Sequence, residues 1–294
     1  MLLLTAAALA VSCSAPAPSQ GAGAEPRVTS SRPAPTTTTA PPTTSSTAPP
    51  TSTPSPPAGT VRSPTRKPSA ANPLPAADRY PLHTGIVATT FWVGEVFDPN
   101  AADGSQVYST YDGQWETHYG GCDGVTAGGS CQTERRTAAD GYFPTAMTPR
   151  QNPFYLDLPF DDVNNNAAFQ QRDQVIPWAH DPAYAGHVGD QSVSLMKNRW
   201  VELSRAGHVC YGQVEDAGPG DYDDATYVFG TGDARPANGK FNGAGLDVSP
   251  ALTGCLAFSE LNGENNEVDW RFVDDAAVPA GPWKKIVTTS GLTE

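Results

Sequence analysis

The sequence predicts a mainly-β domain, a small barrel built from short strands, and three observations lead to this fold class. All 26 aromatic residues (10 Phe, 10 Tyr and 6 Trp) lie from Tyr80 onward, so the hydrophobic core must be formed by residues 80–294. Within that part, short runs of β-branched and aromatic residues alternate with Gly and Pro, as strands and turns do in small barrels. Helical patterns are few in the same stretch.

The expected strands share this β-branched and aromatic composition. In chain order they cover residues 84–97, 106–111, 154–158, 192–203, 209–215, 226–229, 267–273 and 283–288. The fourth and fifth should pair as a hairpin across the turn at 204–207. Two short helices are expected, at 161–172 and 249–258, and the second has Ser249 as a good N-cap with Pro250 at its first position.

The first residues of the chain have the features of an export signal. Leu2–Val11 is an apolar run that is too short to span a bilayer and has the length of a signal-peptide core. It ends in Leu9-Ala10-Val11-Ser12-Cys13, which resembles a bacterial lipobox. We therefore expect residues 1–13 to be a signal peptide with Cys13 as the lipidation site. Ordinary cleavage near Ala10 is the alternative.

A long segment without aromatic residues follows the signal. The 65 residues from Ser14 to Asp78 contain 16 Pro, 10 Ser and 12 Thr. Such a composition does not bury enough apolar surface to offset the entropy lost on ordering, so residues 14–79 are expected to be a disordered linker. The expected location is extracytoplasmic, either attached to the cell membrane by the lipid anchor alone or secreted.

The charge of the domain limits its partners. From residue 79 onward there are 13 basic and 29 acidic residues, a net charge of −16. Such a domain repels a phosphate backbone, so no nucleic-acid partner is expected. Neutral polysaccharides and zwitterionic peptidoglycan remain compatible with this charge. The domain is expected to be a monomer, and no motif in the sequence predicts a cofactor or a metal site.

Cysteine usage agrees with export. Without Cys13, four cysteines remain, an even set in an exported domain. Four cysteines allow three pairings, and the glycine-rich loop between Cys122 and Cys131 closes easily. We expect the disulfides Cys122–Cys131 and Cys210–Cys255. A zinc site built from all four is the alternative, but the sequence has no C-x-x-C pair.

Three segments carry a family resemblance. They are the hairpin of residues 199–214, the turn Glu215-Asp216-Ala217-Gly218-Pro219, and the strand end and helix start at residues 244–252. Their order resembles that of the double-psi β-barrel of rare lipoprotein A, expansins and related small endoglucanases. The resemblance implies a six-stranded double-psi β-barrel over residues 80–294, with Asp216 and Asp247 as the acidic residues of its two motifs.

The chain also departs from the pattern of that family. Ala217 stands where the lipoproteins have Arg, Leu246 where expansins have an aromatic residue, and Gly245 where they have His. Residues 112–150 are expected to be an insertion that is closed by the first disulfide. These departures concern the activity more than the fold.

Asp247 is the expected general acid. Leu246 and Val248 flank it, and partial burial raises the pKa of a carboxyl, which then protonates a glycosidic oxygen. Inverting hydrolysis also needs a base, for which Glu95 and Asp216 are the candidates. A lytic transglycosylase needs one carboxyl only. Alternatively, Asp247 caps the following helix and Asp216 forms a turn hydrogen bond.

The sequence therefore predicts an exported protein that cleaves peptidoglycan or another neutral polysaccharide, with lytic transglycosylase activity ahead of hydrolysis. A non-catalytic, expansin-like carbohydrate-binding module or a structural envelope protein is the alternative. The segment near the first disulfide is rich in residue types that bind sugars, although for any one ring a place in the core is the simpler interpretation. The residues expected to bind the glycan are Trp92, Trp115, His118, Tyr119 and Asp123.

Overall fold

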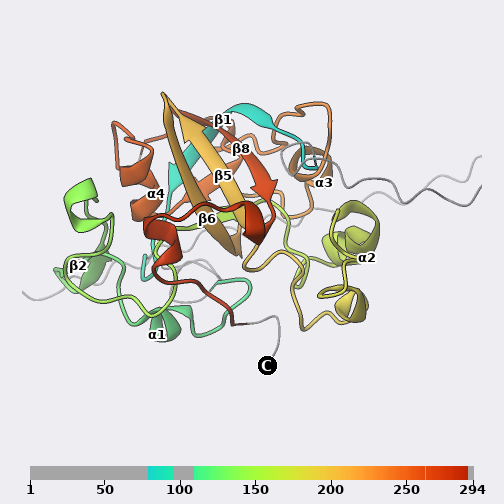
Figure 1. The fold of residues 1–294 in the computed structure, drawn as a ribbon, viewed down its shortest axis with the longest axis horizontal. Helices are drawn as coiled ribbons and strands as arrows, with labels where there is room; N and C mark the ends of the chain where they lie inside the picture. Colours follow the sequence, from blue (N-terminus) through green and yellow to red (C-terminus); the bar gives the residue numbers. More distant parts are fainter. Residues whose placement is uncertain (1–78, 96–108, 262, 291–294) are drawn as a thin grey trace, which may run out of the picture. The chain divides into compact units, whose positions relative to one another are not determined.

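The computed structural model describes residues 79–95, 109–261 and 263–290. Six strands close into a barrel in the order β1-β7-β4-β6-β5-β8 (Figure 1), so the prediction of a mainly-β barrel is confirmed. The expected signal peptide with Cys13 and the linker lie outside the described residues. The barrel strands are His83–Thr90 (β1), Tyr155–Leu158 (β4), Trp200–Arg205 (β5), His208–Ala217 (β6), Leu246–Val248 (β7) and Asn266–Val273 (β8).

The pairing of these strands has an internal symmetry. β1 is parallel to β7 and β4 is parallel to β6, whereas the other neighbours are antiparallel. Exchanging β1, β4 and β5 with β6, β7 and β8 leaves every pairing unchanged. The barrel thus consists of two interlocked halves, as in a double-psi β-barrel. In this exchange the sequence Leu156-Asp157-Leu158 of β4 corresponds to Leu246-Asp247-Val248 of β7.

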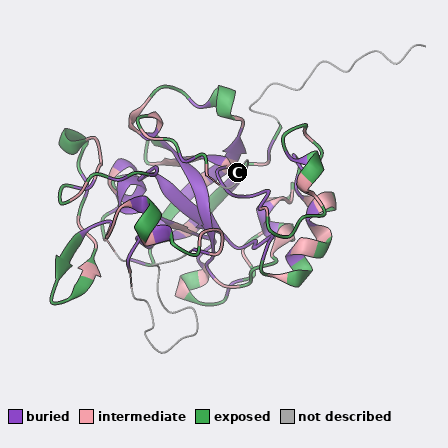
Figure 2. Ribbon diagram, turned by 90° about the horizontal axis from the view of Figure 1, so that it is seen from below, coloured by how far each residue is buried: buried purple, intermediate pink, exposed green. Residues whose placement is uncertain are grey.

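The core fills the barrel. Leucine and valine side chains of β4 and β7 are fully buried and pack with Trp270 and Phe272 of β8 in one apolar cluster. Successive side chains of a strand point to opposite faces, so Asp157 and Asp247 lie on the outer face of the barrel. Figure 2 shows the buried strands at the centre and the exposed hairpin of the insertion beside them.

Local signals explain where the two predicted helices begin. Ser249 accepts a hydrogen bond from the N–H of Leu252, and the helix Pro250–Cys255 (α4) follows it as predicted. The helix Asn166–Val175 (α2) begins later than the predicted residue 161. The side chain of Asp161 instead accepts from the N–H groups of Val163 and Asn164, and Asn165 provides the N-cap.

Two of the predicted strands are wrong and two are shorter than predicted. The strand predicted at 84–97 ends at Thr90, and the first half of the one predicted at 106–111 lies outside the described residues, while its second half is not a strand. Residues 226–229 lie in a short helix, Ala225–Val228 (α3), because the side chain of Asp224 caps it by accepting from the N–H of Tyr227. Residues 283–288 contain a 3₁₀ turn, Pro282–Lys284, and no strand. Of residues 192–203, only the part from Trp200 onward is a strand. No local pattern in the sequence predicts the helix Trp115–Tyr119 (α1).

The disulfide prediction is confirmed for both pairs. Cys122–Cys131, with a Cα–Cα distance of 5.6 Å, closes the insertion around the hairpin of Val125–Ala127 (β2) and Ser130–Gln132 (β3). Cys210–Cys255, with a Cα–Cα distance of 6.3 Å, joins β6 to α4. The insertion packs closely on the end of β1, since a Cβ at Gly94 would lie 3.0 Å from Cys131 Sγ.

We expect the two disulfides to differ in their contribution to stability. They close loops with sequence separations of 9 and 45 residues. In the chain-entropy description, replacing Cys210 and Cys255 by Ala lowers the free energy of unfolding by about 1 kcal/mol more than replacing Cys122 and Cys131. Urea unfolding of the two double variants measures the difference. A larger loss from the short loop would contradict the prediction.

Candidate functional site

Three carboxyl groups lie side by side on the outer face of the barrel. In the register of the strands, Thr89 of β1 is opposite Asp247 of β7, and Asp157 of β4 is opposite Asp216 of β6. The antiparallel pairing of Leu156 with Val248 places Asp157 beside Asp247. We call Asp247, Asp157 and Asp216 the carboxyl row.

Hydrogen bonds tie the first two members of the row together. Thr89 Oγ1 donates to the Asp247 carboxylate, and the backbone N–H of Asp247 donates to Asp157 Oδ1 over 2.7 Å. The two carboxyl groups also share a hydrogen bond. It adds to the effect of burial in raising the pKa of Asp157, and it partly offsets the effect of burial on the pKa of Asp247. Asp157 is therefore the member of the pair that carries the proton.

Asp216 is held at the other end of the row by the backbone. One of its oxygens accepts from the N–H of Thr110 and from that of Ala217, each over 2.8 Å. The turn that follows approaches Asp157 so closely that a Cβ at Gly218 would lie 2.7 Å from Asp157 Oδ2. A glycine at position 218 thus allows the turn after β6 to pack against the row.

The three carboxyls of the row and the carboxyl of Glu95 have raised pKa values, mainly because burial disfavours the charged form. Burial and the neighbouring carboxyls of Asp247 and Asp216 raise the pKa of Asp157 well above its usual range. Burial raises the pKa of Asp216 to about 7 and that of Asp247 to about 6. Burial and the charge of Asp247 raise the pKa of Glu95 to about 8.

The sequence singled out three of these four acidic residues. The structure places Asp216 and Asp247 on one face with Asp157 between them, and Glu95 lies in the turn after β1, where the charge of Asp247 contributes to its raised pKa. Asp157 was missed. The signal that could have found it is the repeated Leu-Asp followed by Leu or Val and then a proline within two residues, at 156–159 and 246–250.

A purely structural role was the alternative for both Asp247 and Asp216, and it does not fit the two residues equally well. Ser249, not Asp247, caps α4. The carboxylate of Asp247, a half-buried residue, instead binds Thr89 and Asp157. Asp216 does form the backbone hydrogen bonds that a turn residue forms, so a structural role fits Asp216 better than Asp247.

The aromatic residues predicted to bind a glycan lie in the interior. Trp115 and Tyr119 are 1% and 0% exposed and pack with Phe91 and Tyr155 in a second core under the insertion. Trp92 is 7% exposed, and its Nε1 donates to the carbonyl of Cys131. In this structure these rings support the insertion and have little surface exposed to a sugar.

Asp123 has a structural role for a similar reason. It is 1% exposed and forms an ion pair with Arg136, with 2.7 Å between Oδ1 and the guanidinium. Its other oxygen accepts from the hydroxyl of Tyr155, which in turn accepts from the N–H of Val93. Asp123 thus joins the insertion to β4 and to the segment after β1, and it does not face a glycan.

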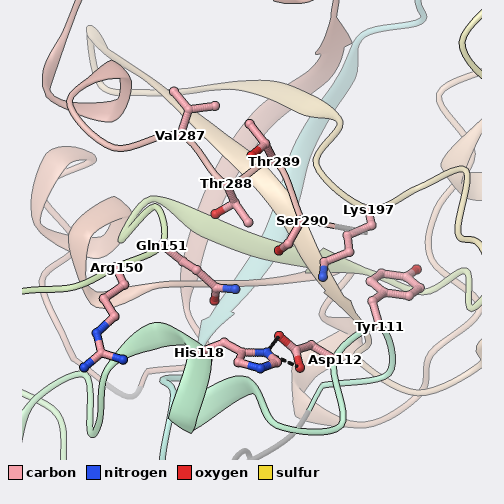
Figure 3. Close-up of a pocket in the computed structure, with 10 residues that line it drawn as sticks. All are labelled: Tyr111, Asp112, His118, Arg150, Gln151, Lys197, Val287, Thr288, Thr289 and Ser290. Carbon is pink, nitrogen blue, oxygen red and sulfur yellow. Dashed lines mark hydrogen bonds and ion pairs between the residues drawn. The ribbon is translucent and has the colours of Figure 1, made fainter. Parts of the chain in front are cut away.

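Of the residues predicted to bind the glycan, His118 lies at an open site. It lines a pocket of about 430 Å³, and its ring is half exposed (Figure 3). Its Nδ1 lies 2.8 Å and 2.9 Å from the two carboxylate oxygens of Asp112, so the ring orientation is fixed. This pocket is distinct from the carboxyl row.

No known protein family, curated protein or solved structure matches the chain. The described residues contain no group of three or more His, Cys, Asp or Glu side chains arranged to hold a metal ion. In the same ranges no helix has the length and apolarity needed to cross a membrane. A function must therefore be argued from the chemistry of the site.

Proposed function

We propose that the protein cleaves glycosidic bonds in a neutral polysaccharide, peptidoglycan first among them, and that Asp247 transfers the proton. The carboxyl row is the observation that carries this proposal. It places the carboxyl of Asp247, a half-buried residue, beside two further carboxyls of raised pKa on one barrel face. General acid catalysis of glycoside cleavage needs a carboxyl that stays protonated near the working pH.

The reaction uses Asp247 twice. Below about pH 6 its carboxyl is protonated and donates the proton to the glycosidic oxygen as the C1–O bond breaks. The carboxylate that results accepts the proton of the sugar's own 6-hydroxyl, whose oxygen forms the new bond to C1. The products are a 1,6-anhydro sugar end and a chain with a free hydroxyl, and Asp247 is protonated again. No water is consumed.

The pKa values favour this route over inverting hydrolysis. An inverting hydrolase needs one carboxyl protonated and a second ionised to activate water. At a pH low enough to protonate Asp247, the carboxyls of Asp216 and Glu95, with pKa values of about 7 and 8, are protonated as well. Neither then acts as a base. A mechanism that needs one carboxyl fits the row better.

The sequence features support the same proposal. The resemblance to rare lipoprotein A and expansins agrees with a glycan-active barrel. One departure from expansins has a steric reason, because a Cβ at Gly245 would lie 2.5 Å from the hydroxyl of Tyr227, and a histidine does not fit there. The lipobox-like sequence at Cys13 supports a protein that acts outside the cytoplasm and is attached by a lipid anchor alone or is secreted.

The binding-module alternative has less support. An expansin-like module needs an open aromatic face, but Trp92, Trp115 and Tyr119 are buried. A purely structural role does not account for the half-buried Asp247 in a row of carboxyls with raised pKa. We therefore propose no second function.

The pH dependence of the reaction tests this proposal. The full chain is incubated with peptidoglycan and, separately, with cellulose, and soluble products are identified by mass spectrometry. We expect anhydro products from peptidoglycan, at rates that are highest below about pH 6 and fall about tenfold per pH unit above it, because the pKa of Asp247, about 6, sets the protonated fraction. Products without anhydro ends would indicate hydrolysis. Absence of products from both glycans would remove the proposal.

A further inference from the structure

The pocket that contains His118 is bounded by parts of the chain that are far apart in sequence. Its walls are α1, the segment that precedes β5 and the C-terminal residues 287–290 (Figure 3). The C-terminal wall is fixed by the amide of Gln213, which donates to the carbonyl of Thr288 and accepts from its N–H over 3.0 Å and 2.9 Å. The Oγ1 of Thr288 accepts from the N–H of Asn152 over 3.0 Å. The pocket is therefore a preformed site.

Three polar groups at this pocket have no partner in the described chain. Lys197 is 4% exposed, yet its ammonium group forms no hydrogen bond or ion pair there. Gln151 is 7% exposed, and its Oε1 is buried without a hydrogen bond. Ser290 Oγ is also buried without one. In Figure 3 these side chains surround one hollow. Unpaired buried polar groups are costly, so the unpaired Gln151 Oε1 and Ser290 Oγ, beside a lysine that forms no ion pair, indicate a ligand that pairs with them.

The charge balance indicates an anion. The charge of Lys197 acts on the carboxyl of Glu215, but burial outweighs it and raises the pKa of Glu215 to about 8. The other carboxylate of the pocket, Asp112, is bound by His118. Lys197 forms no ion pair with either of these carboxyls, so its ammonium group remains available to an anionic ligand.

We propose that this pocket binds a carboxylate that stands next to an amide N–H, as in an N-acylated amino acid. The Lys197 ammonium and the Ser290 hydroxyl donate to the carboxylate, and Gln151 Oε1 accepts from the amide N–H. This assignment gives each unpaired group the partner that its chemistry requires. The volume of about 430 Å³ is in the usual range of small-molecule sites. The proposal does not depend on glycan cleavage by the carboxyl row.

Two small probes test the proposal on the full chain. N-acetylglycine has the carboxylate and the amide N–H, whereas N-acetylglycinamide has the amide without the charge. We expect N-acetylglycine to shift the NMR signals of residues around the pocket and N-acetylglycinamide to bind at least about tenfold more weakly, the effect of losing one charged hydrogen bond. Equal binding of both probes, or shifts that lie elsewhere, would overturn the proposal.

Variants locate the site. Lys197→Met should weaken N-acetylglycine binding at least about tenfold, whereas Lys240→Met removes the same charge from an exposed position and should not change it. Ser290→Ala removes a hydroxyl that has no partner in the fold, so the variant should fold normally and bind severalfold more weakly. Ser290→Ala therefore tests the site even if Lys197→Met does not fold. Unchanged binding in a folded Lys197→Met variant and in Ser290→Ala would contradict the assignment.

Discussion

Asp247→Asn is expected to lower the rate of glycan cleavage at least about 100-fold, the low end of what general acid catalysis contributes. The amide has the shape of the carboxyl but has no proton to transfer. Its oxygen still accepts from Thr89, and its NH₂ group donates to Asp157, which changes from donor to acceptor, so the free energy of unfolding should change by about 1 kcal/mol, the net contribution of one hydrogen bond. Product release from peptidoglycan and urea unfolding measure the two quantities.

A variant in the same row provides the matched control. Asp157 is the protonated member of its pair, so Asp157→Asn replaces an O–H donor to Asp247 by an N–H donor and keeps the oxygen that accepts from the backbone of Asp247. Activity should be largely retained. Asp223→Asn, at an exposed position, should have no effect. If Asp157→Asn lost as much activity as Asp247→Asn, the proposed proton roles within the row would be wrong.

Arg172→Met should lower the free energy of unfolding by about 3 to 5 kcal/mol, the usual cost of breaking a buried ion pair from one side. The guanidinium of Arg172 is fully buried at the C-terminal half of α2 and forms an ion pair with Asp162. It also donates to the backbone carbonyls of five residues, all of which lose this hydrogen bond in the variant. They are Asp162, His187, Asp190, Val188 and Val193.

The control for this prediction is an exposed arginine. Arg235, whose side chain is 56% exposed, forms a surface ion pair with Asp233, and such pairs contribute about 1 kcal/mol or less. Urea unfolding of Arg172→Met and Arg235→Met compares the two. Similar losses in the two variants would mean that the loop around residues 187–193 does not depend on the guanidinium of Arg172.

Strong local signals were enough to predict much of the fold. Residues 84–90 are rich in β-branched side chains and lie in β1, the glycine-rich spacing of Cys122 and Cys131 predicted their disulfide, and Ser249 before Pro250 predicted the start of α4. In each of these cases the interaction that decides the structure lies within a few residues in the sequence. Motif order then placed Asp216 and Asp247 on the same face.

Other features depend on contacts that are distant in sequence. Residues 226–229 have high β propensity, but the cap by Asp224 and the packing of Tyr227 on Trp270 hold them as a helix. Trp115 and Tyr119 looked like a binding surface because nothing local shows that the insertion packs them against Tyr155. The role of Asp157 follows from a strand pairing across about 90 residues, which one sequence does not disclose.

The exchange symmetry of the barrel has a consequence for the direction in which the proposed glycan would bind along the carboxyl row. Asp157 and Asp247 occupy corresponding positions in the two halves, and so do Thr89 and Asp216 at the ends of the row. A fully symmetric row would accept a glycan equally well in either direction. Here one end offers a hydroxyl and the other a carboxyl, so the two directions differ in free energy. The difference between Thr89 and Asp216 therefore gives this face a polarity, and it is what would let the barrel distinguish the reducing from the non-reducing end of a chain.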